Sequence, residues 1–215
     1  MDDGHTLPSE QRDFVAWHRG RPHYAVWALA LCGAAIDARL ERVRRALQPW
    51  LLPGYARQPH ITLQLCGFVT DAARDAGEFG AAQLQAHAAA LTRLKLPPFE
   101  LHIGDAFSFA SAACLAVDDP SQSLQRLRHA LQQAAPHRDA TPYVPHVTAG
   151  LYSGRWPLRE VAQRLQVLTG LPPIRVEVRS LAWMCYETRH IGGPLRTLRV
   201  FDLRRASLDE VAPPA

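Results

Sequence analysis

The sequence has almost no lysine and no long apolar segment. Only Lys95 is a lysine among 24 basic residues, and 20 acidic residues leave a formal net charge of +4. No apolar run reaches the roughly 18 residues that a membrane-spanning helix requires. Residues 1–8 are acidic and polar, unlike a secretory leader. We therefore expect a cytoplasmic protein that does not associate with membranes.

Cysteine is also scarce, and its distribution excludes two classes of small protein. The four cysteines lie far apart within apolar stretches and form no CxxC motif, so we expect reduced, buried side chains and neither a disulfide framework nor a zinc cluster. With 47% hydrophobic and 20% charged residues, the chain is not disordered, collagen-like or a coiled coil as a whole. The mild excess of arginine over acidic residues does not require a double-stranded nucleic acid as the partner, because a small anionic ligand would explain it equally well.

What the sequence does contain is an internal repeat. Residues 40–48 read LERVRRALQ and residues 124–132 read LQRLRHALQ, at an offset of 84. Both segments place their aliphatic residues on one face of a helix. Each follows a short apolar run and precedes a loop with proline and then another apolar run. The pattern predicts a duplicated unit of strand, helix, loop and strand.

Further periodic segments complete the predicted fold. Apolar spacing predicts two more helices, at 79–94 and 158–168, and three more strands, at 98–104, 174–182 and 196–203. We expect one α+β domain of two similar lobes, preceded by an extension and followed by a tail, with boundaries at 1–22, 23–203 and 204–215.

The second strand of each repeat begins with nearly the same four residues. Pro-His-Ile-Thr occupies 59–62 and Pro-His-Val-Thr occupies 145–148. The composition would give roughly 0.03 copies of Pro-His-x-Thr by chance. Alternate side chains of a strand share a face, so His60 projects with Thr62 and His146 projects with Thr148. If the lobes pack about a pseudo-twofold axis, these four side chains converge in one cleft.

Two imidazoles and two hydroxyls suit phosphodiester chemistry. Histidine titrates near neutrality, so one member of a pair can accept a proton while the other donates one. Threonine hydroxyls can donate to the non-bridging oxygens of a phosphoryl group and stabilise its transition state. The sequence therefore predicts an enzyme that needs no metal, and the motifs themselves do not say which histidine is the acid.

The paired motifs in a duplicated α+β chain resemble the 2H phosphoesterase superfamily, most closely the bacterial RNA 2′,3′-cyclic phosphodiesterases, also called the 2′-5′ RNA ligase family. The resemblance covers roughly residues 23–203. Gly193 and Pro194 before the last apolar run look like the family's closing segment, although Leu195 stands where the family commonly has tyrosine.

The resemblance implies a bilobal fold with a pseudo-twofold axis, in which two antiparallel-rich sheets line a central cleft and helices lie outside. It also implies hydrolysis of 2′,3′-cyclic phosphates on RNA ends or nucleotides to 2′-phosphates, with 2′-5′ RNA ligation as the reverse reaction. His60 would be the proton donor and His146 the proton acceptor. We expect no cofactor and no metal, a role in RNA processing, and a monomer.

Less specific interpretations of the motifs compete with this one. A histidine in an apolar strand is often a core residue bonded to a backbone carbonyl. A zinc site would use His60 and Cys66 with His146 across the cleft, although threonine is not a usual ligand. The same cleft could also serve a non-catalytic module that holds a nucleotide or RNA, and turnover distinguishes the two.

Two further residues are candidates for contact with the substrate. Tyr152 falls on the predicted catalytic face and could stack on a base, or it could cap the edge of the core. Arg57 stands three residues before His60 and could reach a phosphate, or it could be an exposed, solvated side chain.

Overall fold

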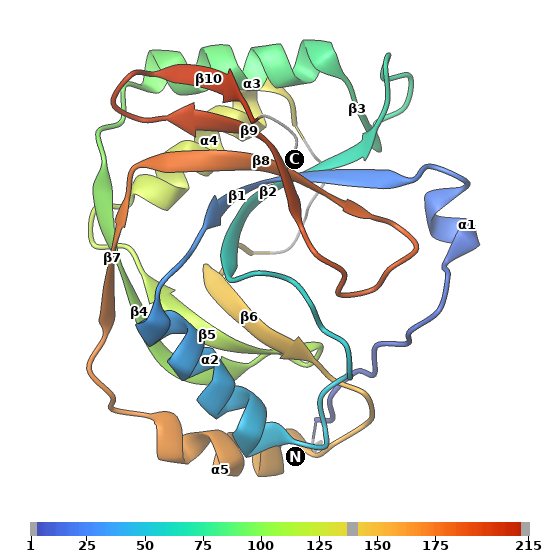
Figure 1. Cartoon of the computed structure of the whole chain (residues 1–215), viewed down its shortest axis with the longest axis vertical. Helices are drawn as coiled ribbons and strands as arrows, with labels where there is room; N and C mark the ends of the chain where they lie inside the picture. The colour runs from blue at the N-terminus through green and yellow to red at the C-terminus, as the bar shows by residue number, and fades with distance from the viewer. Residues whose placement is uncertain (1–3, 137–141, 212–215) are drawn as a thin grey trace.

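The computed structural model describes residues 4–136 and 142–211, and its strands form two sheets (Figure 1). The larger sheet has the strand order β10-β9-β8-β1-β2-β3, and the smaller has the order β6-β5-β4-β7. The strands of the larger sheet are β1 (His23–Ala30), β2 (His60–Val69), β3 (Glu78–Phe79), β8 (Ser180–Glu187), β9 (Arg196–Asp202) and β10 (Ser207–Glu210). Those of the smaller sheet are β4 (Phe99–Ser108), β5 (Ala112–Asp118), β6 (His146–Leu151) and β7 (Ile174–Val178). All neighbours are antiparallel except β2 and β3, so the expected α+β class with two antiparallel-rich sheets is confirmed.

The helices cover the two sheets in an exchanged arrangement. Four helices pack on the sheets: α2 (Ala34–Leu47), α3 (Ala81–Leu94), α4 (Ser123–Ala134) and α5 (Leu158–Leu165). Helix α5 is continued by a 3₁₀ turn at Gln166–Leu168. Helix α2 follows β1 of the larger sheet but contacts β5 and β6 of the smaller one, beside α5. Helix α4 follows β5 of the smaller sheet but contacts β2 of the larger one, beside α3. Each lobe therefore contains the helix of the other repeat (Figure 1).

The strand register supports the predicted duplication. In each lobe the strand before the helix pairs with the motif strand, β1 with β2 and β5 with β6. The pairs are Ala30 with His60, Leu29 with Ile61 and Ala28 with Thr62 in one lobe, and Ala116 with His146, Leu115 with Val147 and Cys114 with Thr148 in the other. Every residue of the second set lies 86 positions after its counterpart, so the two motifs occupy equivalent places in equivalent strand pairs.

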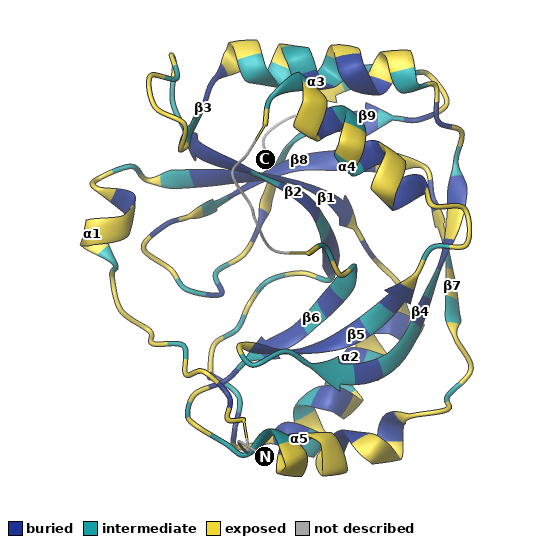
Figure 2. Ribbon diagram, turned by 180° about the vertical axis from the view of Figure 1, so that it is seen from behind, coloured by how far each residue is buried: buried dark blue, intermediate teal, exposed yellow. Residues whose placement is uncertain are grey.

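A single apolar core runs through both lobes. It joins Trp27 and Leu29 of the larger sheet to Leu115 and Val147 of the smaller, and all four are at most 1% exposed. Figure 2 shows the buried residues concentrated on the strands and on the helix faces that meet them. A smaller apolar cluster, of Tyr24, Val26, Ala28, Phe68, Ala182, Met184 and Leu195, lies on the other face of the larger sheet.

The expected elements appear, with corrections at both ends of the chain. The strand expected at 174–182 is two strands, β7 and the start of β8, which belong to different sheets. The expected tail at 204–215 contains β10, which pairs with β9, so the larger sheet extends past residue 203. Of the expected extension, Thr6 N donates to Trp156 O at 2.9 Å and Ser9 N donates to Tyr152 O at 2.7 Å. A short helix, α1 (Val15–His18), follows that segment.

Two structural findings concern membranes and metals. Of the helices in the described ranges, none combines the length and apolar character that crossing a bilayer requires. Among the same residues, His, Cys, Asp and Glu side chains nowhere gather in threes close enough to bind a metal ion.

Candidate active site

The two motif strands present open edges to each other. Strand β6 is an edge of the smaller sheet, and β3 pairs only with Phe68 and Val69 at the far end of β2. The half of β2 that begins at His60 is therefore unpaired on one side. Strands β2 and β6 contact each other without forming a ladder, and both views show them side by side in the middle of the molecule (Figures 1 and 2). This placement brings the two Pro-His-x-Thr motifs into one region.

Both histidine rings are held in the same way by the backbone. His60 Nδ1 donates to the carbonyl of Gln58 at 2.8 Å, and His146 Nδ1 donates to the carbonyl of Val144 at 2.7 Å. In each case the acceptor is two residues earlier, across the proline. A carbonyl can only accept, so each ring carries its proton on Nδ1 when neutral and leaves Nε2 for proton transfer. A core histidine would also bond to a backbone carbonyl, as the alternative interpretation expected. That interpretation does not account for the same bond at the same position in both lobes.

The two imidazoles differ in their burial and charge environment. His60 is 7% exposed, whereas His146 is half-buried. Burial is the main cause that lowers the pKa of His60 to about 4. The hydrogen bond to Gln58 opposes this shift, and the charges of Arg57 and His146 add to it. The free protein therefore holds His60 neutral at pH 7. The influence of His146 on that pKa indicates that the two rings share one electrostatic environment.

The threonines of the two motifs have different neighbours. Thr62 and Thr148 are both half-buried. Cys114 is opposite Thr148 on β5. Burial raises the pKa of the Tyr55 hydroxyl and of the Cys114 thiol, and the Thr148 side chain opposes that rise in both. Thr62 is contacted through its backbone, because Tyr143 Oη donates to its carbonyl at 3.0 Å. Tyr55 carries no sequence pattern that could have singled it out.

Arg57 supplies positive charge beside His60. Its guanidinium lies over the ring of Tyr186 at 4.2 Å, and Arg57 Nε is buried without a hydrogen-bond partner. Among the described residues, no carboxylate forms an ion pair with it. Arg57 is half-buried and not the solvated surface residue of the competing interpretation. A guanidinium with no carboxylate beside it can bind an anion.

Tyr152 is not available to a substrate, so that prediction was wrong. Its side chain is 0% exposed within the core, and its hydroxyl lies 2.6 Å from the Ser108 hydroxyl. The reason is a β-bulge: Cys114 pairs with Thr148, but the preceding residue of β5, Ala113, pairs with Gly150. The extra residue reverses the alternation of side chains beyond it. The catalytic face of β6 therefore ends before Tyr152, which projects into the core.

Bulges in β2 change its second half in the same way. Register shifts follow the pairs of Thr62 and of Leu65, so Gln64 and Cys66 do not continue the face of His60. Cys66 packs in the main core, and burial raises the pKa of its thiol. The alternative zinc site required Cys66 beside His60, and the structure places them on different faces.

Aromatic rings line the region beside both motifs. The Phe109 ring lies edge-on to His146 with centroids 5.0 Å apart, and Phe107 packs against Phe109 at 4.9 Å. Both phenylalanines and Tyr186 are half-buried, whereas Trp183 is a core residue at 7% exposure. Phe109 thus adjoins His146, and Tyr186 adjoins Arg57, so these half-buried rings lie nearer to the motif residues than a core aromatic side chain does.

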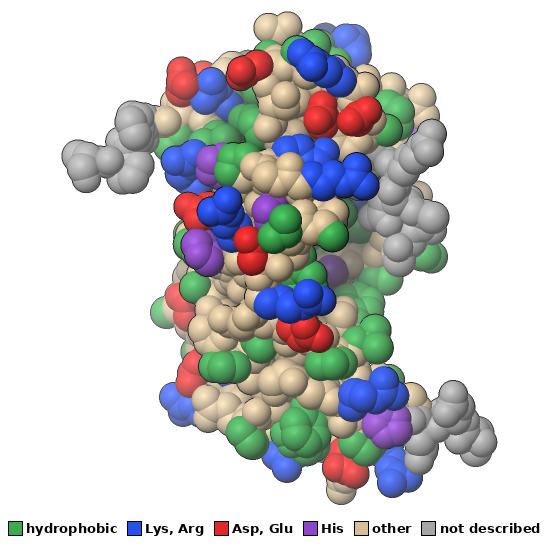
Figure 3. All heavy atoms as spheres, turned by 90° about the vertical axis from the view of Figure 1, so that its right-hand side faces the viewer, with side chains coloured by type: hydrophobic (Ala, Val, Ile, Leu, Met, Phe, Trp, Pro, Cys, Tyr) green, Lys and Arg blue, Asp and Glu red, His purple; other side chains and the backbone are tan. Residues whose placement is uncertain are grey.

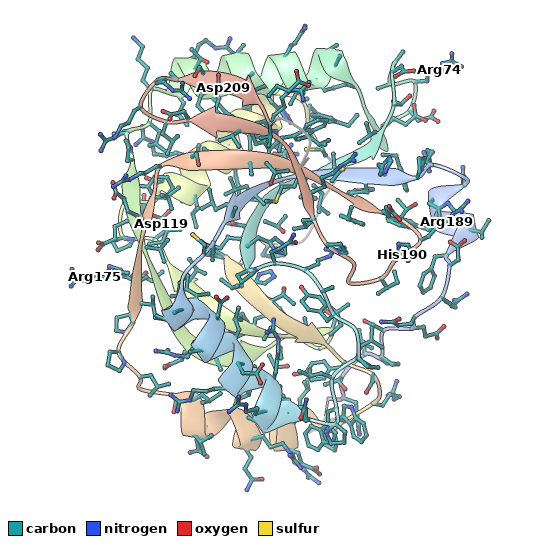
Figure 4. All side chains as sticks on the ribbon, in the orientation of Figure 1. Arg74, Asp119, Arg175, Arg189, His190 and Asp209 are labelled. Carbon is teal, nitrogen blue, oxygen red and sulfur yellow. The ribbon has the colours of Figure 1, made fainter. Side chains whose placement is uncertain are left out.

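The surroundings of this region are open and mixed in charge. The space-filling view shows the surface hollowed between the two lobes, with acidic and basic side chains interspersed around it (Figure 3). Three of the charged side chains labelled in Figure 4, those of Arg74, Arg175 and Asp209, lie at the periphery of the molecule in that view. Arg57 and His146 are the charged groups that lower the pKa of His60.

The comparison with known families identifies one superfamily. The sequence model of the 2′-5′ RNA ligase superfamily matches residues 33–190, which include both motifs. The chain belongs to the 2′-5′ RNA ligase superfamily. Members of this superfamily are phosphoesterases and ligases. A search among curated protein sequences finds no match.

Solved structures share the superfamily fold at low sequence identity. E. coli LigT complexed with 3′-AMP is 18% identical, with a TM-score of 0.54 over 84% of this chain and 98% of LigT. TT0787 of Thermus thermophilus is 16% identical, with a TM-score of 0.55 over the same shares of the two chains. ATU0111 from Agrobacterium tumefaciens is 14% identical, with a TM-score of 0.51 over 84% of this chain and 87% of ATU0111. These similarities establish the bilobal fold.

Proposed function

We propose that this member of the 2′-5′ RNA ligase superfamily hydrolyses 2′,3′-cyclic phosphates, on RNA ends or nucleotides, to 2′-phosphates. The observation that carries the proposal is the equivalence of the two Pro-His-x-Thr motifs: the same strand register, the same backbone bond to Nδ1, and an Nε2 left for proton transfer. A histidine pair that served packing alone would not need a threonine on the same face in both lobes. The nucleotide in the LigT complex is consistent with a nucleotide ligand here.

The proposed reaction is an in-line displacement at phosphorus. A water molecule loses a proton to one imidazole and attacks phosphorus. The bond from phosphorus to the 3′ oxygen breaks, its electron pair stays on that oxygen, and the other imidazole protonates it. The product carries a 2′-phosphate and a 3′-hydroxyl. If the 5′-hydroxyl of a second RNA replaces water, the same proton transfers form a 2′-5′ linkage.

The environment of His60 adds a condition to its proposed role as the acid. With a pKa of about 4 in the free protein, His60 is neutral at pH 7 and has no proton on Nε2 to donate. A bound phosphodiester places a negative charge near the ring, and such a charge favours the protonated imidazole. His60 therefore takes up its proton together with the substrate. His146, the proposed base, is less buried than His60.

The remaining polar residues are proposed to hold the phosphoryl group. The Thr62 and Thr148 hydroxyls donate to its non-bridging oxygens, where charge accumulates in the transition state. Arg57 balances that charge from the His60 side. These residues act without a metal ion, so the proposal predicts activity in the presence of a chelator.

The decisive experiment is turnover on a panel of 2′,3′-cyclic phosphates. The panel contains the four mononucleotides, a short oligoribonucleotide with a cyclic end, and a nicotinamide-derived cyclic phosphate. Phosphorus NMR records whether the product is the 2′- or the 3′-phosphate. We expect 2′-phosphates as products and a rate of turnover that EDTA does not change. Loss of activity in EDTA that zinc restores would contradict the mechanism, and binding without turnover would support the non-catalytic nucleotide-binding module instead.

A further inference from the structure

Aromatic rings lead from the first motif to the surface of the molecule. Arg57, in the loop before that motif, lies over the Tyr186 ring at 4.2 Å. The Tyr186 and Tyr24 centroids are 5.6 Å apart, and the Tyr24 ring stacks on Trp17 of α1, also at 5.6 Å. Phe68 contacts both of the last two rings, with its centroid 5.0 Å from each. We call the rings of Trp17, Phe68, Tyr24 and Tyr186 the aromatic row.

The aromatic row lies on the face of the larger sheet that carries the first motif. Tyr24 and Phe68 belong to the apolar cluster on this face, together with Ala28. Ala28 of β1 pairs with Thr62 of β2, and residues that are opposite each other in an antiparallel pair project to the same side of the sheet. An RNA bound at the first motif therefore meets the row on the side of the sheet where it is bound.

Trp17 forms the exposed end of the aromatic row. It is 41% exposed, whereas Tyr24 is 8% and Phe68 is 5% exposed. Val15, in the same turn of α1, is 60% exposed. The buried rings thus support the indole on one side and leave the rest of it to solvent. Bases stack on aromatic rings that are accessible in this way.

The residues that follow Trp17 fix its position. His18 is 1% exposed, and its Nε2 lies 2.6 Å from Asp13 Oδ1. The Thr188 hydroxyl, directly after β8, donates to the carbonyl of Arg21 at 2.7 Å and so connects the segment after α1 to the larger sheet. A ring that is ordered before binding loses little conformational entropy when a ligand stacks on it.

Arginines accompany the aromatic row. The Arg21 guanidinium lies over Phe68 at 3.7 Å and pairs with Glu78 at 3.8 Å. Arg19, directly after α1, is exposed and, like Arg57, forms no ion pair within the part of the chain that the structure describes. Both guanidinium groups are therefore available to phosphates.

A cavity of about 330 Å³ lies beside Tyr186. The loop that follows β8 lines it with His190 and Pro194, and β1 lines it with His23. Figure 4 shows His190 on this loop, on the side of the molecule that carries α1. The volume is within the usual range for small ligands, so the cavity offers a place for one nucleotide beside the row.

We propose that the aromatic row is a binding track for single-stranded RNA, in which a base that precedes the cyclic phosphate stacks on Trp17 and Arg19 binds a phosphate. A 2′,3′-cyclic phosphate ends an RNA at its 3′ side, so all other nucleotides leave the site in one direction. For turnover this inference rests on the proposed function, and it names an RNA end as the preferred substrate. Trp17 and Arg19 precede residues 33–190, which match the superfamily model, so the track lies outside the matched region.

The binding test uses a fluorescein-labelled hexaribonucleotide that ends in a 2′-phosphate, with fluorescence anisotropy as the measurement. Trp17→Ala should weaken its Kd about fivefold to a hundredfold, the usual contribution of one stacked base. Trp17→Phe keeps a smaller ring and should lose less. Val15→Ala is the matched control, because it removes an exposed apolar side chain from the same turn, and its Kd should equal that of the wild type. Equal Kd values for Trp17→Ala and the wild type would overturn the inference.

Turnover tests the substrate class. The wild-type kcat/KM should be higher for a hexaribonucleotide with a cyclic end than for a mononucleotide 2′,3′-cyclic phosphate. Trp17→Ala should lower only the hexaribonucleotide value, about fivefold to a hundredfold and mainly through KM. RNA binding that depends on Trp17 without turnover of either substrate would reject the proposed function and keep the inference. Turnover of both substrates at wild-type rates in Trp17→Ala would overturn the inference and leave the function standing.

Sedimentation equilibrium tests the other occupant of this surface, a second copy of the chain. We expect the wild type and Trp17→Ala to have the same oligomeric state. A wild-type dimer that Trp17→Ala dissociates, together with an unchanged Kd for the hexaribonucleotide, would assign the exposed indole to self-association and overturn the inference.

Discussion

At the scale of single residues, the proline of each motif sets up the histidine that follows it. Proline fixes its own φ and pushes the preceding residue into an extended conformation. In both lobes that preceding residue turns its carbonyl to the imidazole, Gln58 to His60 and Val144 to His146. This role of the proline explains why the two lobes share the four-residue motif Pro-His-x-Thr and not only His-x-Thr. It fixes the ring orientation and the tautomer, on which acid-base chemistry depends.

The hydroxyls are expected to matter less than the imidazoles. Thr62→Val or Thr148→Val should lower kcat on a cyclic phosphate by about 10² to 10³, the usual effect of removing one transition-state donor. His60→Ala and His146→Ala should each cost more, and the double variant should be nearly as active as either single variant, because acid and base act as one unit. Initial rates and circular dichroism of each variant check this. If both histidine variants fold normally and keep near-wild-type rates, the active site does not lie at the two motifs.

A substrate whose leaving group needs no proton should separate the two histidine roles. An aryl phosphodiester such as bis(p-nitrophenyl) phosphate expels a stable phenolate. His60→Ala should therefore be impaired more than the threonine variants on a cyclic phosphate, by up to about 10⁴, but only slightly on the aryl diester. His146→Ala should be impaired on both. Release of nitrophenolate provides the measurement, and the opposite ranking of the two variants would exchange their assignments.

The low pKa of His60 also predicts how stability depends on pH. Between pH 6.5 and about 4 the unfolded chain protonates this imidazole and the folded protein does not, so the folded state loses stability as pH falls through this window. The loss attributable to His60 is at most about 3 kcal/mol. His60→Asn should show a shallower decline in urea-unfolding free energy from pH 7 to 4. His87, whose pKa burial also lowers, remains in both proteins as the internal reference. Parallel pH profiles for the two proteins would contradict this prediction.

At the scale of elements, the sequence predicts the repeated unit but not its irregularities. Helical spacing and the repeated LxR and PHxT words are sufficient to place α2, α4, β2 and β6. The positions of the β-bulges could not be predicted from the alternation of polar and apolar residues along a strand. That pattern has a period of two and does not show where one extra residue is inserted. That is why Tyr152 and Cys66 were assigned to the wrong face. The position of Tyr143 could not be predicted for another reason: the Thr62 carbonyl to which it donates is brought to it only by the packing of the two lobes.

The segment after Gly193 and Pro194 shows how the fold tolerates a departure from the family pattern. The side chain of Gln58 bonds the backbone of Leu195 twice, Nε2 to the carbonyl at 3.0 Å and the Leu195 N to Oε1 at 2.9 Å. Leu195 itself is 4% exposed in the apolar cluster beside Tyr24. Because the anchor uses backbone atoms, it does not require tyrosine. The same Gln58 supplies the carbonyl that holds His60, so this loop is connected to the motif.

Helix α2 provides a prediction at this scale. Leu40 is 1% exposed and packs in the core that α2 shares with the smaller sheet. Leu40→Ala should lower the free energy of unfolding by about 2 to 5 kcal/mol, through lost burial and the cavity left behind. Val167→Ala, at a position 72% exposed, is the matched control and should change it by less than about 0.5 kcal/mol. Urea titrations followed by circular dichroism measure both. Equal stability of the two variants would mean that α2 is not anchored as the structure shows.

At the scale of the whole molecule, the exchange of helices makes the two lobes interdependent. The chain builds half of the larger sheet, then the smaller sheet, and then returns to complete the larger one. Helix α2 covers the sheet that does not contain β1, and α4 covers the sheet that does not contain β5. Neither lobe can therefore bury its own apolar face alone. This architecture also holds β2 against β6, so the geometry of the site depends on the integrity of both lobes.

The interdependence of the lobes predicts one cooperative unfolding transition despite the bilobal shape. Pulsed hydrogen exchange with mass spectrometry, across a urea titration, follows peptides from the β1–β2 pair and from the β5–β6 pair separately. Both sets should lose protection at the same urea concentration, because the apolar core that contains Trp27, Leu29, Leu115 and Val147 is continuous. Peptides from α1 (Val15–His18), a single helical turn in which only His18 is buried, should exchange at lower urea and show that the method resolves local opening. Two separate midpoints for the sheets would mean that each lobe folds by itself, and the site would then form only where two independently stable units dock.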